Sequence, residues 1–185
     1  MLPDTVESED IKFALTHKTD GEKNALECTG QTIQLPQGNY TRLYLLAAAN
    51  EDTRADFTID GQATPLQIQQ WTGKVGQFYN RILSRDQNSV VEMQNPFVKT
   101  DNIAWFASHT HSAYPSKNEA YQYCYLYKYE ITIPAGAKTL TLPDNKKIKL
   151  LALTVAAPNA GNVTTLQPLY DDFKGNGAFK LRTGK

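Results

Sequence analysis

Strict alternation of large apolar and mixed side chains marks the segment from residue 121 to residue 133. Every odd position there is aromatic or aliphatic, namely Tyr121, Tyr123, Tyr125, Tyr127, Tyr129, Ile131 and Ile133. A period of two places alternate side chains on opposite faces of a β-strand. Because the segment is longer than most strands, we expect a bulge or a bend within it. Its ring-bearing face needs a cover, which predicts a second sheet packed against the first.

Shorter apolar runs of the same kind predict further strands. They cover residues 11–15, 31–35, 43–49, 55–60, 66–71, 90–93, 103–107, 139–142, 148–155 and 163–169. Turn-forming residues stand between several of these runs, as in Pro36-Gln37-Gly38, Asp60-Gly61 and Pro134-Ala135-Gly136. We expect residues 139–142 to pair with the following strand across a turn at residues 143–145. Residues 72–81, which are punctuated by glycine, and residues 109–117 are predicted to be loops.

This series of predicted strands, without a convincing amphipathic helix, indicates the all-β class. Hairpin turns at short spacing favour an antiparallel two-sheet β-sandwich, and within that class a jelly roll. We expect residues 1–30 to form an N-terminal extension with one possible edge strand. Residues 31–170 are predicted to form the sandwich, and residues 171–185 a C-terminal tail.

Length and charge narrow the function classes. A chain of 185 residues fits one domain that can bury a core of its own. Nineteen basic and nineteen acidic residues give a net charge of zero, so the chain lacks the basic field typical of nucleic-acid and anionic-membrane binders. No apolar run is as long as a membrane span. The acidic N-terminus does not read as a signal peptide, so an exported protein would be represented here as a mature form or a fragment.

The two cysteines, Cys28 and Cys124, leave two readings open. They could form one disulfide in an oxidising compartment, but their spacing cannot place them within bridging distance. The sequence favours two unpaired, partly buried thiols.

Aromatic residues near predicted loops suggest a sugar-binding surface. Exposed rings stack on sugar faces, and neighbouring amide and guanidinium groups bond to the hydroxyls. Trp105 lies within a strand pattern and is expected in the core, whereas Trp71 can be either buried or exposed. The candidate ligand-binding residues are Trp71, Gln77, Tyr79, Arg81, His109, His111, Tyr114 and Asn118.

Two short motifs could hold a metal ion. His109 and His111 share one face of an extended segment, and Asp101 or Glu119 could complete a metal site. The alternative is that both histidines are hydrogen-bonding surface groups. Oxygen atoms of the segment Asn50-Glu51-Asp52 could bind a structural calcium ion, although the spacing of a calcium loop is missing and a plain solvated loop is the alternative. No other cofactor is expected.

Catalytic signatures are missing from the sequence. The chain has no Gly-x-Ser-x-Gly elbow, no phosphate-binding glycine loop and no zinc-type pattern of cysteine and histidine. Paired carboxylates of the kind used in glycoside hydrolysis cannot be recognised by spacing alone. The sequence therefore favours a non-catalytic role.

Three strings carry a resemblance to a known family. They are residues 30–36 with residues 44–49 (GQTIQLP and YLLAAA), residues 99–109 (KTDNIAWFASH) and residues 118–129 (NEAYQYCYLYKY). Together they resemble the C-terminal β-sandwich region of bacterial α-mannosidase-like enzymes of glycoside hydrolase family 38, which has a galactose-binding-like jelly-roll character. In that family the nucleophile and the zinc ligands lie in a separate catalytic domain, so no catalytic residue is carried over. The resemblance implies an extracellular or periplasmic accessory domain whose partners are the catalytic domain of its parent chain and carbohydrate.

These observations lead to three hypotheses. The first is the non-catalytic accessory domain of a glycoside hydrolase, acting as support or contacting glycan. The second is a free-standing carbohydrate-binding module that uses Trp71, Tyr79 and Tyr114. The third is a small hydrolase that uses His109, His111 and Glu119, with or without a metal ion.

Overall fold

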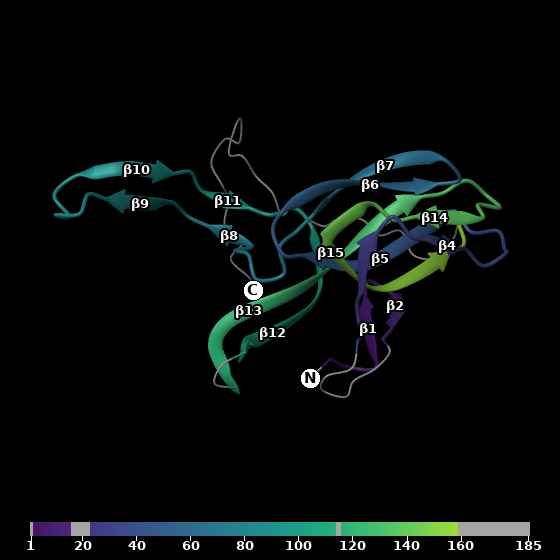
Figure 1. The fold of residues 1–185 in the computed structure, drawn as a ribbon, viewed down its shortest axis with the longest axis horizontal. Coiled ribbons are helices and arrows are strands. Elements are labelled where there is room, and N and C mark those ends of the chain that lie inside the picture. The colour runs from purple at the N-terminus through teal and green to yellow at the C-terminus, as the bar shows by residue number, and fades with distance from the viewer. Residues whose placement is uncertain (1, 16–22, 114–115, 159–185) are drawn as a thin grey trace, which may run out of the picture. The chain divides into compact units, whose positions relative to one another are not determined.

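Two antiparallel sheets form the body of the protein in the computed structural model, which describes residues 2–15, 23–113 and 116–158 (Figure 1). The larger sheet has five strands in the order β12 (Asn102–Ala113), β13 (Ser116–Thr132), β5 (Arg42–Ala49), β15 (Asp144–Ala156) and β3 (Leu26–Thr29). The smaller sheet has four, in the order β4 (Thr32–Gln34), β14 (Thr139–Thr141), β6 (Thr53–Ile59) and β7 (Gln62–Ile68). The predicted antiparallel β-sandwich is confirmed. The described residues include no helix long and apolar enough to cross a membrane.

The inner face of the five-stranded sheet carries the core between the two layers. Tyr127 pairs with Ala47 and Tyr129 with Leu45, and cross-strand partners share a face, so the tyrosines and the odd positions of β5 point the same way. Tyr127, Tyr129, Ile131 and Ile133 are all at most 5% exposed. They belong to one buried cluster with Phe57 and Ile59 of β6, Ile68 of β7 and Leu140 of β14. The predicted covering of the ring face is thus correct for this half of β13.

The N-terminal half of β13 departs from that prediction. Tyr125 is half-buried and Tyr123 is 42% exposed, so the second sheet does not cover the ring face there. The expected irregularity is confirmed, because the β12–β13 register shifts between Ile103 and Trp105 and again between Ala107 and His109. Figure 1 shows β12 and β13 as a long curved hairpin.

The outer face of the five-stranded sheet is covered by the hairpin of β1 (Thr5–Ser8) and β2 (Ile11–Ala14). The hairpin contributes Val6, Ile11 and Phe13 to the core, which explains why β5 is buried on both faces. Thr154 of β15 donates its hydroxyl to the Lys12 carbonyl over 2.6 Å. Residues 1–30 therefore contribute this hairpin and the edge strand β3 to the sandwich.

Turn chemistry was predicted well, and one strand pairing was not. Asp60 and Gly61 both have positive φ and join β6 to β7 directly, and Gly136 has positive φ in the turn after β13. The prediction that residues 139–142 pair across a turn with the next strand is wrong. β14 pairs with β4 and β6 in the smaller sheet, and the chain then crosses into the larger sheet as β15. Alternation reveals strands but not their partners.

Two predicted loops contain strands. Residues 109–113 form the end of β12 and residues 116–117 the start of β13, while residues 72–81 include β8 (Gly76–Gln77) and the start of β9 (Asn80–Leu83). With β10 (Val90–Gln94) and β11 (Phe97–Val98), these belong to a second compact unit that includes residues 74–100. In it β9 pairs with β10, and β8 with β11. The predicted strand at 163–169 and the tail at 171–185 lie outside the described residues.

Candidate functional site

An exposed aromatic face lies on the β12–β13 hairpin, where the inner face of the larger sheet emerges from beneath the smaller sheet. Phe106 of β12 pairs with Tyr125 of β13 and is 61% exposed. Tyr123 lies two residues before Tyr125, and the two rings are nearly parallel, with 6.5 Å between centroids and 14° between planes. We call Phe106, Tyr123 and Tyr125 the aromatic face. Three rings on one side of a rigid ribbon form a surface suited to a flat ligand.

The aromatic face continues the ladder of rings that enters the core. Ring centroids are 6.2 Å apart between Tyr125 and Tyr127 and 6.4 Å apart between Tyr127 and Tyr129. Burial raises the pKa of Tyr125, Tyr127 and Tyr129 above its ordinary value, so these phenols stay protonated at physiological pH. The phenols of these rings are therefore uncharged, and the strand that carries the exposed rings continues into the buried core.

Trp71 joins this region through the backbone. The Tyr125 N–H donates to the Trp71 carbonyl over 2.7 Å, and the Trp71 N–H donates to the Ala49 carbonyl over 3.0 Å. The Trp71 side chain is 41% exposed, which answers the question that the sequence left open. Trp105 is half-buried and packs against the core, so the expectation that it lies in the core is met only in part.

Three predicted ligand-binding residues, Gln77, Tyr79 and Arg81, lie in the unit that includes residues 74–100. The Arg81 guanidinium carbon is 5.2 Å from the centroid of the Tyr79 ring, which is a cation–π contact. Phe78 is 81% exposed beside Tyr79. The structure thus groups Tyr79 and Arg81, while Trp71 and the histidines belong to the sandwich.

The residues of the hydrolase hypothesis, His109, His111 and Glu119, do not all lie on one face of the β12–β13 hairpin. His109 pairs with Ala120, and Glu119 pairs with Thr110, so Glu119 and His109 lie on opposite faces of the hairpin. His111 and Asn118 are partners in the backbone register of β12 and β13. Among the described residues, no group of three or more His, Cys, Asp or Glu side chains could hold a metal ion. Tyr114 lies outside the described residues.

The candidate calcium motif, Asn50-Glu51-Asp52, follows β5 and lies at the surface. Glu51 forms an ion pair with Lys147. A carboxylate oxygen of Asp52 accepts the backbone N–H of Gln70 over 2.7 Å. Both carboxylates therefore have roles within the fold, and calcium binding by this segment stays a prediction.

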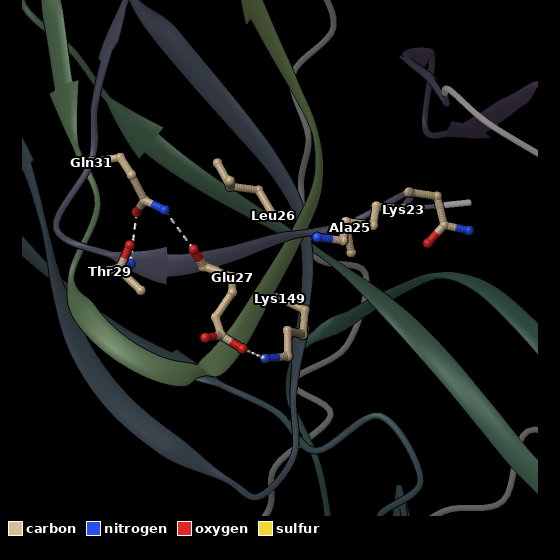
Figure 2. Close-up of a pocket in the computed structure, with 8 residues that line it drawn as sticks. Lys23, Ala25, Leu26, Glu27, Thr29, Gln31 and Lys149 are labelled. Carbon is tan, nitrogen blue, oxygen red and sulfur yellow. Dashed lines mark hydrogen bonds and ion pairs between the residues drawn. The ribbon is translucent and has the colours of Figure 1, made fainter. Parts of the chain in front are cut away.

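A cavity of about 630 Å³ adjoins β3, the edge strand of the larger sheet (Figure 2). Its lining residues are Lys23, Asn24, Ala25, Leu26, Glu27, Thr29, Gln31 and Lys149. The Glu27 carboxylate forms an ion pair with the Lys149 ammonium (Figure 2), and the nitrogen and oxygen atoms are 2.5 Å apart. This hydrogen bond and the charges of Lys149 and Lys146 lower the pKa of Glu27, against a smaller opposing effect of burial.

A comparison with protein families assigns the fold. The family model of the AziU2-like beta-sandwich domain matches residues 1–159. The chain belongs to this family. No curated protein matches the chain in a sequence search. Membership of the AziU2-like family agrees with the sandwich and with the inclusion of the β1–β2 hairpin in it, and it says nothing of glycoside hydrolases, of α-mannosidases or of carbohydrate.

Sequence reasoning did not select Phe106 and Tyr123 as candidate binding residues. Alternation alone assigned both residues to strands, where apolar side chains are usually covered. The signal that could have identified them is length. The apolar alternation of β13 spans more residues than a typical opposing strand can cover, so part of its ring face must extend beyond the second sheet.

Proposed function

We propose that this AziU2-like domain is a non-catalytic accessory module that binds carbohydrate through the aromatic face of β12 and β13. The observation that carries the proposal is the exposure of Phe106 and Tyr123 beside Tyr125 on a strand whose next tyrosines are buried. Such rings offer apolar area to the C–H face of a sugar, and phenol hydroxyls can bond to its hydroxyl groups.

The proposal extends to the setting of the domain. A binding module without catalytic machinery acts by holding its substrate near an enzyme, so we place it with a glycoside hydrolase that acts on mannose-containing glycans. Its partner would then be the catalytic domain of the parent chain, in the extracellular or periplasmic space. The three strings that resemble α-mannosidase-like enzymes support this setting.

Titration calorimetry against mannan, mannobiose and galactobiose tests the carbohydrate part. We expect binding that is weakened about tenfold by Tyr123→Ala and by Phe106→Ala, since loss of one stacked ring is worth about 1–1.5 kcal/mol. Both positions are exposed, so the melting temperatures of these variants should match that of the parent protein.

Tyr79→Ala is the matched control, because it removes an exposed ring from the other compact unit. Affinity that falls with Tyr79→Ala and not with Tyr123→Ala would move the sugar site to the Tyr79–Arg81 pair. Heats of dilution alone for every glycan would refute carbohydrate binding and leave a supporting role for the domain.

A further inference from the structure

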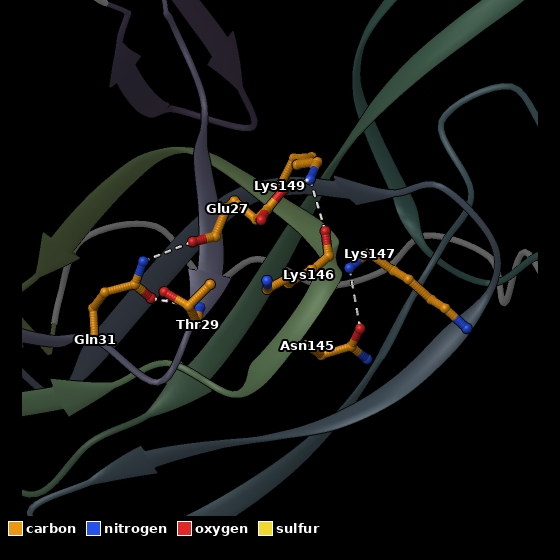
Figure 3. Close-up of polar contacts among 7 residues, drawn as sticks. All are labelled: Glu27, Thr29, Gln31, Asn145, Lys146, Lys147 and Lys149. Atoms are coloured by element: carbon orange, nitrogen blue, oxygen red, sulfur yellow. Dashed lines mark hydrogen bonds and ion pairs between the residues drawn. The ribbon is translucent and has the colours of Figure 1, made fainter.

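Among the described strands, β3 pairs with β15 alone, and its other edge bonds to the side chain of Gln31. The side-chain amide of Gln31 donates to the Glu27 carbonyl over 2.7 Å, and its oxygen accepts the backbone N–H of Thr29 over 2.7 Å (Figure 3). Cys28, between them, pairs with Asn145 of β15. Because backbone groups alternate along a strand, Glu27 and Thr29 present theirs to the side away from β15. The Gln31 carboxamide therefore occupies the position of a neighbouring strand's peptide group.

The surroundings of this edge suit an extended ligand. The cavity of about 630 Å³ runs along β3, and Leu26 within it is 42% exposed. Lys23 and Lys149 line the cavity, and Lys146 lies near enough to lower the pKa of Glu27. Two acidic residues of this region, Glu27 and Asp144, offset these charges in part, and Asp144 lies at the Thr29 end. Among the described side chains named here, three lysines outnumber two carboxylates, and Lys149 pairs with Glu27, next to Leu26.

We propose that the β3 edge binds an extended acidic peptide by strand addition, with the peptide displacing the Gln31 carboxamide. Backbone groups of the peptide would bond to the Glu27 carbonyl and the Thr29 N–H, and an apolar side chain would pack on Leu26. Acidic side chains of the peptide would face Lys23 and Lys149. Gln31 acts as an internal competitor that satisfies the strand edge while no peptide is bound. This surface is separate from the aromatic face and does not depend on the function proposed for it.

Nuclear magnetic resonance titration with end-blocked synthetic hexapeptides tests the proposal. The probe alternates valine and glutamate, and its comparison peptide alternates valine and lysine. We expect shifts in the amide signals of residues 26–29 with the acidic peptide alone. The same acidic peptide N-methylated at every residue has no backbone N–H to donate to the strand edge, and it should not bind.

Three variants sharpen the test. Gln31→Ala removes the competitor and should tighten acidic-peptide binding by about five- to tenfold, from the loss of two competing hydrogen bonds. Lys149→Gln should weaken binding, whereas Lys147→Gln, the matched control on the same strand, pairs with Glu51 instead and should not. The unfolding transition of each variant shows whether it retains the native fold, and the wild-type titration stands without them.

Two results would overturn the proposal. Equal binding of the N-methylated peptide would show that contact does not occur by strand addition. Absence of acidic-peptide binding to the wild-type protein and to Gln31→Ala would refute peptide binding at this edge. Concentration-dependent self-association of Gln31→Ala would then show that Gln31 closes the edge against another copy of the chain.

Discussion

The backbone N–H of Gln69 donates to the phenol oxygen of Tyr129 over 2.8 Å in the buried interior. Gln69 follows β7 of the smaller sheet and Tyr129 lies in β13 of the larger one, so this hydrogen bond links the two layers. Gln69 is 6% exposed, so water has little access to its backbone N–H.

Tyr129→Phe should therefore destabilise the fold by about 1–3 kcal/mol, since it strands a buried donor while keeping the ring. Chemical denaturation followed by circular dichroism measures the change. Tyr123→Phe is the control and should leave the free energy of unfolding within about 0.5 kcal/mol, because its ring is partly solvated. Equal effects of the two substitutions would contradict a role for the buried bond.

How far the sequence predicts this layered body can be judged from β13. Its alternation specifies the strand and the buried face at Tyr127 and Tyr129. It does not show where the opposing sheet ends, because that depends on the length of strands elsewhere in the chain. Tyr123 follows the same pattern and is exposed for this reason.

Short strands also depend on distant parts of the chain, which limits what the local sequence can predict. β3 has four residues and only Cys28 among them is buried, so the sequence gives it almost no periodic signal. Its presence depends on pairing with β15, which is far away in the chain. The cavity and the Gln31 contacts at this edge are likewise tertiary, and no local pattern predicts them. Turns are easier to predict from the local sequence, because a pair such as Asp60-Gly61 favours the positive φ angles that the turn requires.

The Asp60 carboxylate makes the stability of the fold depend on pH. The backbone N–H of Lys138 and the hydroxyl and N–H of Thr139 donate to it, and these bonds lower its pKa in the folded state. A lowered folded pKa means that the stabilisation is present above the unfolded pKa of about 4 and is lost as the pH falls through the folded value.

We therefore expect Asp60→Asn to flatten part of the fall in melting temperature between about pH 5 and pH 2. Asparagine tolerates the positive φ at this position, so the turn should be kept. Asp56→Asn, at an exposed position of β6 just before this turn, is the comparison. An unchanged pH profile in Asp60→Asn would assign the acid sensitivity to other carboxylates.

The Lys128–Glu9 ion pair fastens the β1–β2 hairpin to the larger sheet and is buried on one side only. The Lys128 side chain is 1% exposed and its ammonium also donates to the Ser8 carbonyl over 3.2 Å, whereas Glu9 is 38% exposed. Removal of Lys128 leaves a carboxylate that water can solvate. Removal of the Glu9 charge leaves a buried ammonium without its counter-ion.

Glu9→Gln should thus cost more stability than Lys128→Met, and the cost should reach about 2 kcal/mol. The double variant should be no less stable than Glu9→Gln alone, since the stranded charge is then gone. Glu7→Gln, in an exposed pair with Lys12 on the same hairpin, should change the free energy of unfolding by less than about 0.5 kcal/mol. Denaturant titrations of the four variants decide the order, and a larger cost for Lys128→Met would contradict it.

The sheet order separates Cys28 from Cys124. Cys28 lies in β3 and Cys124 in β13, with β5 and β15 between them. Three strand spacings of about 4.8 Å put them about 14 Å apart, which is beyond the reach of a disulfide. Both are free thiols in the structure, so the unpaired reading favoured by the sequence is confirmed.

Alkylation at pH 8 followed by mass spectrometry should therefore find two reduced cysteines with different rates. Burial raises the pKa of Cys28 to about 11, so its thiolate is scarce at pH 8, and its side chain is inaccessible. Cys124 is only half-buried and should react at least about tenfold faster. Denaturation should bring the two rates together. A Cys28–Cys124 disulfide in the non-reduced digest would contradict the strand order, because no movement short of unfolding the larger sheet could bring the two sulfur atoms into contact.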